Sequence, residues 1–550
     1  MINAVILLND DLDSVSECAT YTSCKSAHAH RSGGASNLFF LLSVSIPRPL
    51  FPIAGYPIIY HHLRSLSEIE QVQHVFLVGR HDPKKFAHFI DDLLTEFSFK
   101  TIQFIQDEVP KNEAGVIFKY KDRILLGNPE YLMVMRYRIC SDFPLHEIIA
   151  YHKEKEERCG KGEEEGGKAL VTVMTARLDH LQQGGEGSQK SYGVFGIDEK
   201  THEVMHYTEE NEAANQMIKY TPQGVKVSPP ANCGIYLFSV RVFEEFGLSS
   251  RTTAADGDSS ERHGYHTGGD STPKDLAQSV KSGASGSEFA KYFSTHQNQQ
   301  LTNGNPSYPY QTKLRAQSFG GESVQHFPEK PGATDAFSQA YLQASRLWQQ
   351  HEESIQMRDV LMILCARGPQ KVFAFVLDPM KGHFYKEISR HEDKLTCQNT
   401  YFKHYSQTCP ELLKRPDELE EEQILGPCFI HPTADIHPSA ILGPNVSIGA
   451  YAKIHEGVRI VNSIILEDAE IQGHTVVINS MVGWNAKIGP WCRIEGTLFS
   501  DERSKQLHGQ KFDVCVLGVG TIMEPEVMLR NCLVMPFMRV KKNDANKIIF

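Results

Sequence analysis

Arg48 is the residue of this sequence that is most clearly placed to do chemistry. It lies in the segment IPRPLFPIAGYPIIYHH (46–62), where Pro47 and Pro49 flank it directly. Because proline fixes its own backbone angle, the arginine sits in a stiff segment, and a rigid guanidinium suits the binding of a phosphate. A phosphate site usually also has a glycine-rich loop at a helix N-terminus, and none adjoins this segment. The segment therefore predicts one part of a phosphate site and leaves the other parts to be found.

The composition argues against several classes of partner. The protein has 550 residues and a formal net charge of -11, so neither nucleic acid nor an anionic membrane surface is expected to bind it. The most apolar run, LFFLLSVSI (38–46), is too short to cross a bilayer. The 12 cysteines show no CxxC pair and no regular spacing, which predicts neither a zinc site nor a disulfide framework. We expect a cytoplasmic protein that binds small molecules or other proteins.

The elements that must position Arg48 follow from the alternation of two periodicities. Short apolar runs predict strands over 2–8, 74–79, 101–107, 131–135, 169–177 and 232–239. Apolar residues at helical spacing predict helices over 83–97 and 143–157. The pattern returns at 358–368 and 371–378 and ends in a helical stretch near 386–406. This alternation predicts an α/β, Rossmann-like domain with a mainly parallel sheet that is covered on both faces.

Three polar segments interrupt this pattern, at 9–36, at 158–190 and from 249 to about 335. Their composition cannot bury enough apolar surface to offset the conformational entropy of ordering, so we expect exposed insertions. The α/β domain is then assigned to residues 1–248 and 350–410, with insertions at 9–36 and 158–190. Residues 249–349 form a separate low-complexity insertion.

From residue 428 the apolar residues follow a period of six. They are Ile430, Ile436, Leu442, Ile448, Ile454 and Ile460, and after five-residue steps the series continues through Ile465, Ile471 and Val477 and through Val482, Ile488 and Ile494. A small or branched residue stands two positions before the next five after Ile430, from Ala434 to Val458. Such repeats predict a left-handed parallel β-helix over 424–550, in which three short strands make one coil. A solenoid of this kind indicates by itself a structural role, in which it caps another part, stacks or forms oligomers, and it carries no chemistry of its own.

Several segments of the chain together resemble a known family. They are IPRPLFPIAGYPIIYHH (46–62), CSDFPL (140–145), SYG (191–193), THEVMHYTEE (201–210), NCGIYLFS (232–239), FIHPTADIHPSAILGPNVSIG (429–449), SMVGW (480–484) and VMLRNCLVMPF (527–537). With the C-terminal solenoid they make the chain similar to the sugar-1-phosphate nucleotidyltransferases, and within these to the mannose-1-phosphate guanylyltransferases of the alpha, or regulatory, type. The resemblance implies a GT-A-like fold. It also implies a reaction, in which a mannose-1-phosphate oxygen attacks the α-phosphorus of GTP with the help of Mg²⁺.

The phosphate loop of this family is rewritten here. The first strand runs into Asp10 and Asp11, where the family has a pair of glycines. Leu38 and Phe40 stand where the family has two phosphate-binding arginines. Because carboxylates repel a triphosphate and apolar side chains cannot bind one, the resemblance implies a degenerate loop.

The metal-binding positions of the family are replaced as well. Arg138 aligns with the metal-binding aspartate, Arg136 with the asparagine two residues before it, and Lys386 with the second metal-side acid. An arginine offers only N–H donors and cannot ligate Mg²⁺. Glu387 is one residue out of register and is expected to face elsewhere, and Asp142 is expected to be a structural carboxylate. We therefore assign neither a metal ligand nor a catalytic residue.

Other ligand-side positions are kept. Residues that match nucleotide-sugar contacts of the family are Arg48, Gly115, Tyr192, Gly193, Glu209, Asn232 and Gly234. Arg48 replaces the lysine that contacts the phosphates, Gly115 matches the last glycine of a turn beside the guanine, and the rest lie along the sugar. These residues either hold a nucleotide sugar or are kept for the turns at strand ends, and the sequence leaves both interpretations open.

Three hypotheses follow from this pattern. The first is a regulatory, catalytically impaired subunit that binds GDP-mannose and assembles with a catalytic paralogue, with a homo-oligomer through the β-helix as a further arrangement. The second is an active nucleotidyltransferase that makes GDP-mannose and holds its metal with Asp10, Asp11 or Asp142. The third is a scaffold that binds no ligand.

Overall fold

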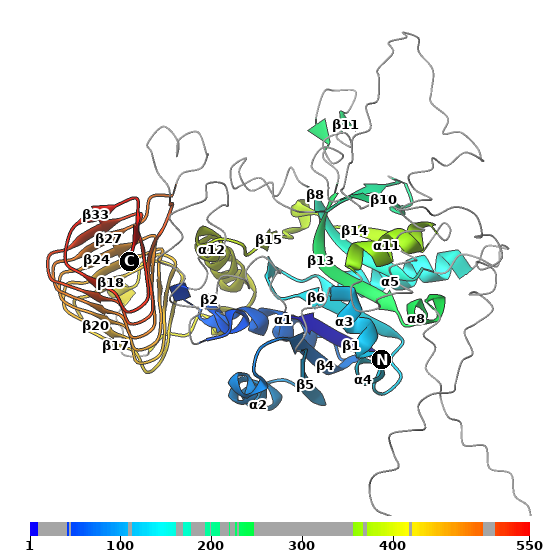
Figure 1. The fold of residues 1–550 in the computed structure, drawn as a ribbon, viewed down its shortest axis with the longest axis horizontal. Coiled ribbons are helices and arrows are strands. Elements are labelled where there is room, and N and C mark those ends of the chain that lie inside the picture. Colours follow the sequence, from blue (N-terminus) through cyan, green and yellow to red (C-terminus); the bar gives the residue numbers. More distant parts are fainter. Residues whose placement is uncertain are drawn as a thin grey trace, which may run out of the picture. The chain divides into compact units, whose positions relative to one another are not determined.

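A computed structural model describes two parts of the chain, an α/β domain built around one twisted sheet and a solenoid of short stacked strands (Figure 1). The described residues are 1–8, 41–42, 46–107, 113–160, 169–177, 193–198, 200–208, 219–220, 226–227, 230–246, 356–366, 371–416, 421–498 and 512–550. The predicted insertions at 9–36 and 249–349 lie outside these residues.

Within the described residues, nine strands form the main sheet, in the order β10-β9-β13-β6-β1-β4-β5, and β8 pairs with both β13 and β14. The strands are β1 (Ile2–Leu7), β4 (Val72–Gly79), β5 (Thr101–Gln106), β6 (Tyr131–Arg136), β8 (Val171–Arg177), β9 (Val194–Ile197), β10 (Val204–Thr208), β13 (Pro230–Ser239) and β14 (Val372–Val376). Small ribbons add β2 (Pro52–Ile53) with β3 (Tyr56–Pro57), β7 (Ile139–Ser141) with β15 (Tyr385–Glu387), and β11 (Lys219–Tyr220) with β12 (Lys226–Val227).

The sheet is mixed, although the sequence predicted a mainly parallel one. β1, β4, β5 and β6 are parallel to one another, and β14 is parallel to β8. β13 runs antiparallel between β6 and β8. The elements described before β13 are antiparallel ribbons rather than a helix, and a parallel strand needs a long crossover that is usually helical.

Helices cover both faces of the sheet. They are α1 (Ile58–Ser67), α2 (Ala87–Glu96), α3 (Glu113–Lys119), α4 (Lys121–Ile124), α5 (Leu145–Gly160), α8 (Val242–Glu245), α11 (Met357–Ala366) and α12 (His391–Thr408), with 3-10 turns η4 (Arg48–Leu50), η5 (Pro83–Lys85), η8 (Pro379–Lys381), η9 (Pro410–Leu412) and η10 (Glu421–Gln423). Along β1, Ala4 and Ile6 pack into one core with α1, α5 and α12, while Val5 and Leu7 pack into a second core with α3, α8 and α11. Strand alternation therefore gives the sheet a buried apolar layer on each face. Among the described helices, none is long and apolar enough to cross a membrane.

Two predicted boundaries need correction. The insertion at 158–190 is wrong over 171–177, because β8 lies there and pairs with β13 and β14 inside the sheet. The helical stretch near 386–406 begins later, at His391, because Tyr385–Glu387 form β15. The other described residues of the predicted insertion at 158–190 are the end of α5, up to Gly160, together with Ala169 and Leu170. The rest of that insertion lies outside the described ranges.

The C-terminal part is a parallel β-helix, as the six-residue period predicted. Over the described residues it has three sheets of stacked parallel strands. The first contains β16 (Cys428–Ile430), β19 (Val446–Ile448), β22 (Ile464–Ile465), β25 (Ser480–Val482), β28 (Cys515–Leu517), β31 (Leu533–Val534) and β34 (Ile548–Ile549). The second contains β17 (Asp435–Ile436), β20 (Lys453–Ile454), β23 (Glu470–Ile471), β26 (Lys487–Ile488), β29 (Ile522–Met523) and β32 (Arg539–Val540). The third contains β18 (Ile441–Leu442), β21 (Arg459–Val461), β24 (Val476–Ile478), β27 (Arg493–Glu495), β30 (Met528–Arg530) and β33 (Asp544–Ala545).

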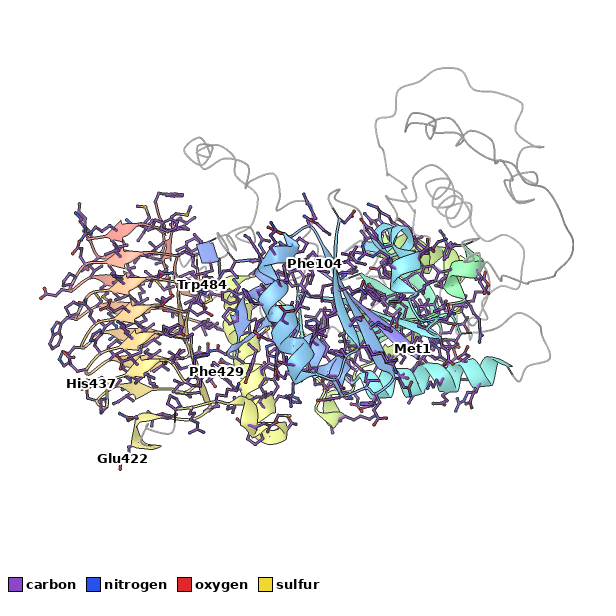
Figure 2. All side chains as sticks on the ribbon, turned by 90° about the horizontal axis from the view of Figure 1, so that it is seen from below. Met1, Phe104, Glu422, Phe429, His437 and Trp484 are labelled. Carbon is purple, nitrogen blue, oxygen red and sulfur yellow. The ribbon has the colours of Figure 1, made fainter. Side chains whose placement is uncertain are left out.

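The apolar residues of the repeat fill the inside of the solenoid. Ile430 stacks on Ile448 and Ile448 on Ile465, and all three are almost fully buried. The stacked strands and the side chains that project from them are visible in Figure 2. Ile436 in the first coil is only partly buried, and its strand β17 is the first of its sheet over the described residues. The series resumes after residue 511 with Leu517, which the repeat pattern up to Ile494 did not include.

The first sheet of the solenoid shares a core with the α/β domain. Its outward residues Phe429, Ile464, Met481, Val516 and Leu533 are buried in the same cluster as α1 and α12. The ring of Phe429 lies 5.2 Å from that of Tyr56, and the ring of Trp484 lies 5.9 Å from that of Phe51. Gln398 of α12 donates to the backbone oxygens of Asn445 and Ser463 at 2.9 and 3.3 Å. This face of the solenoid is therefore covered within the chain.

Candidate functional site

The candidate site lies where the strand order of the sheet reverses. The strands that follow β1 in sequence, β4 and β5, lie on one side of it, and β6 lies on the other. In open α/β sheets, ligands bind at the carboxyl ends of the strands at such a point. Arg136 is the last residue of β6 and pairs with Leu7, the last residue of β1. Arg136 therefore lies where a ligand is expected.

Two arginines at this edge of the sheet each contact a carboxylate. Nε and Nη2 of Arg136 lie 2.6 and 2.8 Å from the two carboxylate oxygens of Glu113, the first residue of α3. Nη2 of Arg138 lies 3.4 Å from Oε1 of Glu387 on β15. The four side chains keep 21% to 39% of their surface exposed. Burial acts to lower the pKa of Arg136, but Tyr236, Glu113 and Glu387 together hold that pKa well above its ordinary value.

The structure reverses the expected orientations of Lys386 and Glu387. Nζ of Lys386 lies 3.2 Å from Oδ1 of Asp393 in the first turn of α12, whereas Glu387 reaches Arg138. The expectation that Glu387 faces elsewhere is therefore wrong. Because neighbouring side chains on β15 point in opposite directions, the lysine turns to α12 and the glutamate turns to the site.

The Mg²⁺ ion that the family resemblance implies does not fit these residues. Mg²⁺ requires oxygen ligands in near-octahedral geometry, and Arg136 and Arg138 supply N–H donors and positive charge instead. Glu113 and Glu387, the carboxylates beside them, already contact these arginines. Across the residues that the structure describes, no group of three or more His, Cys, Asp or Glu side chains is placed to hold a metal ion. No catalytic step through a metal is therefore derived.

Asp142, expected to be a structural carboxylate, makes its described bonds within the protein. Its Oδ2 lies 2.6 Å from Nδ1 of His383, and its Oδ1 accepts a hydrogen bond from the backbone N–H of Phe384 at 3.2 Å. Asp142 thereby fixes the segment that leads into β15. The two other acids of the active-enzyme hypothesis, Asp10 and Asp11, lie outside the described residues, as do Leu38 and Phe40.

Arg48 lies beside the start of α12. It opens η4, and both of its flanking prolines are buried. Lys394 of α12 is fully buried, with Nζ 2.9 Å from Nδ1 of His391 and 5.0 Å from the centre of the Phe51 ring. Burial lowers the pKa of Lys394 well below its ordinary value, and the positive charge of Arg48 lowers that pKa further. Arg48 therefore adds positive charge near Lys394 of α12, the helix whose Asp393 contacts Lys386.

Asn232 is buried, and its side chain bonds within the protein. Its Nδ2 donates to the hydroxyl oxygens of Tyr236 and Tyr207 at 2.8 and 3.4 Å. Its Oδ1 accepts from the backbone N–H of Gly234 at 2.9 Å, and its own backbone N–H donates to Gly193 at 2.8 Å. These bonds surround the irregularity in the pairing of β13 with β8 between Asn232 and Tyr236. The network therefore sets the backbone path at the edge of the site.

Both glycines of this network leave room for a neighbouring side chain. Gly234 has φ +72°, and a Cβ added there would lie 2.7 Å from Cδ of Arg136. A Cβ added to Gly193 would overlap the hydroxyl of Tyr207. L-residues with a side chain rarely adopt the φ of Gly234. Gly234 therefore provides both the backbone turn and the space that place Arg136 across the end of β13.

Three further residues were predicted for the site, Gly115, Tyr192 and Glu209. Gly115 is a buried residue of helix α3, so the backbone there is helical rather than an open glycine-rich turn. Tyr192 and Glu209 lie outside the described residues. Glu113 and Glu387 are the contacts that sequence reasoning missed. The only signal for Glu113 was a charged residue in a segment where the family has glycines.

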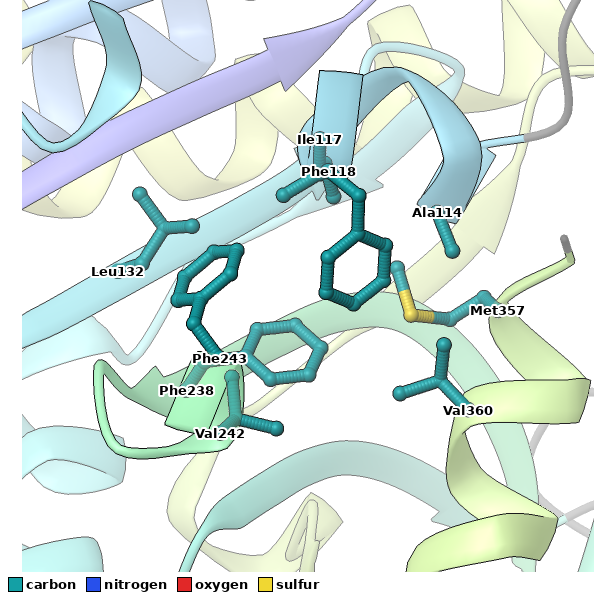
Figure 3. A pocket seen from close by; sticks show the side chains of 9 residues that line it. All are labelled: Ala114, Ile117, Phe118, Leu132, Phe238, Val242, Phe243, Met357 and Val360. Atoms are coloured by element: carbon teal, nitrogen blue, oxygen red, sulfur yellow. The ribbon is translucent and has the colours of Figure 1, made fainter. Parts of the chain in front are cut away.

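A small cavity also occurs in the α/β domain. Its volume is about 10 Å³, and its walls are apolar side chains from α3, β6, β13, α8 and α11, shown in Figure 3. The lining residues are Ala114, Ile117, Phe118, Leu132, Phe238, Val242, Phe243, Met357 and Val360. A volume of this size holds at most one water molecule. We read it as a gap in the core packing rather than a ligand site.

Two family models match the chain in its two structural parts. Residues 32–260 match a model described as nucleotidyl transferase, and residues 424–549 match one described as the GMPPB C-terminal domain. Crystal structures of HddC from Yersinia pseudotuberculosis, one of them complexed with GMP-PN, align with 44% of this chain and 80% of theirs, at 18–19% identity and TM-scores of 0.26–0.27.

Several curated relatives are similar over almost the whole chain. A probable mannose-1-phosphate guanyltransferase of Schizosaccharomyces pombe is 27% identical over 92% of this chain and 95% of its own length. The mannose-1-phosphate guanylyltransferase regulatory subunit alpha of Dictyostelium discoideum is 28% identical over 92% and 94%. The regulatory subunit alpha-B of Danio rerio is 27% identical over 92% and 95%.

Proposed function

The chain belongs to the mannose-1-phosphate guanylyltransferase family, and we propose that it is a regulatory subunit of GDP-mannose biosynthesis with impaired catalysis. The observation that carries this proposal is the pair of ion pairs at the edge of β6. Arg136 and Arg138 stand at the positions that resemble the family's metal site, and each contacts a carboxylate that a metal would otherwise need.

The charge balance of the cluster supports a loss of catalysis. Nucleotidyl transfer depends on positioning the phosphates and on stabilising the charge of the departing pyrophosphate. In this cluster the two guanidinium charges are matched by the carboxylates of Glu113 and Glu387. These ion pairs do not supply the added positive charge that a divalent ion brings. We expect slow or no nucleotidyl transfer by the chain alone.

The proposed ligand is GDP-mannose or a related nucleotide sugar. The ligand-side residues of the proposal are Arg48, Tyr192, Gly193, Glu209, Asn232 and Gly234, with Gly115 near the base. Of these, Asn232 and Gly193 are proposed to fix the backbone at the edge of the site rather than to contact the ligand, because their described bonds lie within the protein. Gly234 acts through the space it leaves for Arg136.

The proposed partner is a catalytic guanylyltransferase paralogue, in a cytoplasmic hetero-oligomer. The relatives from Dictyostelium discoideum and Danio rerio are named regulatory subunits, and a regulatory subunit requires a partner to regulate. One face of the solenoid is covered within the chain. Outward side chains of the two other faces, such as Lys453 and Arg493, are exposed. These faces are the proposed contact surface, for the paralogue or for a second copy of the chain.

Activity and binding measurements test the proposal. The purified full chain is incubated with GTP, mannose-1-phosphate and Mg²⁺, and GDP-mannose formation is measured against the purified catalytic paralogue. We expect at most a small fraction of the paralogue's rate, together with co-purification of the two chains and a thermal shift with GDP-mannose. Formation of GDP-mannose at a rate similar to that of the paralogue would overturn the proposal. The absence of a shift with either GDP-mannose or GTP would instead favour a ligand-free scaffold.

A further inference from the structure

The two arginines at the edge of β6 suggest how a ligand is held without a metal. In metal-dependent sites, a divalent ion neutralises the phosphates and orients them. Here two permanently charged guanidinium groups, Arg136 and Arg138, stand at the positions that resemble the family's metal site, and each contacts a glutamate. We propose that they bind the diphosphate of a nucleotide sugar directly, so that binding needs no divalent cation. This inference rests on the proposed function, because it assumes that the site binds a nucleotide sugar.

Arg136 is held in a fixed position for such a role. Of the five N–H donors of its guanidinium, one on Nη2 donates to Glu113, and Nε lies 2.6 Å from the other carboxylate oxygen of Glu113. A guanidinium is a planar fork that binds carboxylates and phosphates with the same geometry. Gly234 leaves the space in which the side chain lies. With one edge held by Glu113, the guanidinium is pre-organised to offer another edge to an anion at the carboxyl end of the sheet.

Arg138 contacts Glu387 at a longer distance than Arg136 contacts Glu113. Its described ion-pair contact is a single one at 3.4 Å, to Glu387, which is longer than the 2.7–2.9 Å that charged hydrogen bonds usually have. Its side chain is 24% exposed. A phosphate at hydrogen-bonding distance would give this guanidinium a shorter charged contact than Glu387 does. Binding of a diphosphate would draw Arg138 away from Glu387, while Arg136 keeps its contact with Glu113.

Direct binding of the diphosphate by the arginines would reverse the usual effect of Mg²⁺ on the affinity for the ligand. In a metal-dependent site, removing the cation abolishes tight binding of the diphosphate. In this site an added cation has no carboxylate group arranged to receive it among the described residues, and the arginines repel it. Magnesium bound to the free ligand also neutralises the charge that the arginines would bind. We therefore expect GDP-mannose to bind as well in EDTA as in Mg²⁺, or better.

The test is calorimetric titration of the full chain with GDP-mannose, in Mg²⁺ and in EDTA. The expected result is an equal or lower Kd in EDTA. Arg138→Met is expected to weaken binding about tenfold to a hundredfold, the range for one charged hydrogen-bonding group, and Arg138→Lys to weaken it less. Arg158→Met is the matched control, because Arg158 lies in an exposed pair with Glu154 on α5 and its loss should leave Kd unchanged.

The outcomes separate this inference from the proposed function. Tight binding in Mg²⁺ that is lost in EDTA overturns the arginine inference and leaves the regulatory function standing. Binding in neither condition overturns the nucleotide-sugar part of the proposed function as well. Unchanged binding of Arg138→Met in EDTA also overturns the inference, provided its melting temperature shows that it is folded. The comparison of EDTA with Mg²⁺ uses the unaltered chain and so does not depend on the folding of any variant.

Discussion

Replacing Gly234 with alanine tests how the site is built. The new methyl group would meet the side chain of Arg136, with Cδ at 2.7 Å and Cγ at 3.2 Å. These atoms lie in the middle of a side chain whose end is held by Glu113, so Arg136 cannot move aside and keep that contact. Gly234→Ala should therefore both strain the backbone and break the Arg136 ion pair.

The loss of stability expected for Gly234→Ala has two contributions, the backbone strain and the lost ion pair. An alanine at φ +72° costs about 1–2 kcal/mol, of which about 0.4–1 kcal/mol is offset by the lower entropy of the unfolded chain. Loss of the charged contact adds about 1–2 kcal/mol, after allowance for the partial exposure of both groups. Gly382→Ala isolates the backbone part, because Gly382 has φ +87° and nothing lies within 4 Å of its added Cβ. Gly234→Ala should thus be about 1–2 kcal/mol less stable than Gly382→Ala.

Thermal unfolding and ligand titration measure this difference. We expect Gly234→Ala to melt about 2–4 °C below Gly382→Ala and to lose affinity for GDP-mannose, while Gly382→Ala keeps its affinity. In an Arg136→Ala background the alanine at 234 should cost no more than the one at 382. Equal melting temperatures of the two single variants in the unaltered background would show that Arg136 yields freely and would refute the steric reasoning.

Three further predictions concern other parts of the chain. Lys394→Met should stabilise the protein near neutral pH by about 1–3 kcal/mol, because it removes a buried amine. The pKa of Lys394 is lowered in the folded state, so the unfolded chain binds more protons, and the stability of the unaltered protein rises with pH until about pH 10. Unfolding measured at two pH values should therefore show that the stability advantage of Lys394→Met shrinks as the pH rises. An advantage that does not change with pH would contradict the lowered pKa of Lys394. Ile460→Ala, inside the solenoid, should cost about 2–5 kcal/mol, whereas Arg459→Ala on the exposed side of the same strand should cost at most about 0.5 kcal/mol, as denaturant unfolding can check. Asp142→Asn should lower the melting temperature by loosening His383 and leave GDP-mannose affinity unchanged; loss of affinity with normal stability would instead favour a ligand role for Asp142.

Much of the fold could be predicted because its signals are local. The predicted strands at 2–8, 74–79 and 131–135 correspond to β1, β4 and β6 within a few residues, since strand alternation and apolar runs need no distant partner. The six-residue period identified the β-helix for the same reason. The direction of β13 was missed, because it depends on which strands lie beside it rather than on its own residues.

The site was less predictable than the fold. Replacement of the metal-binding acids by Arg138 and Lys386 was readable from sequence, but their contacts were not. Arg138 and Glu387 are 249 residues apart, and which of two adjacent side chains on β15 faces the site depends on the pairing of β15 with β7. Asn232 matched a sugar-binding motif, yet its described bonds run to Tyr207, Tyr236 and Gly234.

By itself, the sequence determined which residue types stand at the positions that resemble the family's metal site. An arginine in place of an acid excludes a metal ligand wherever the chain folds, and the repeat at Ile430 to Ile494 requires a solenoid. The tertiary structure alone decided what the replaced residues do instead. It brought Glu113 and Glu387 to the arginines and fitted Arg136 over Gly234. Charge and period are properties of single residues and short segments, whereas an ion pair exists only when distant segments are folded within a few ångströms of each other.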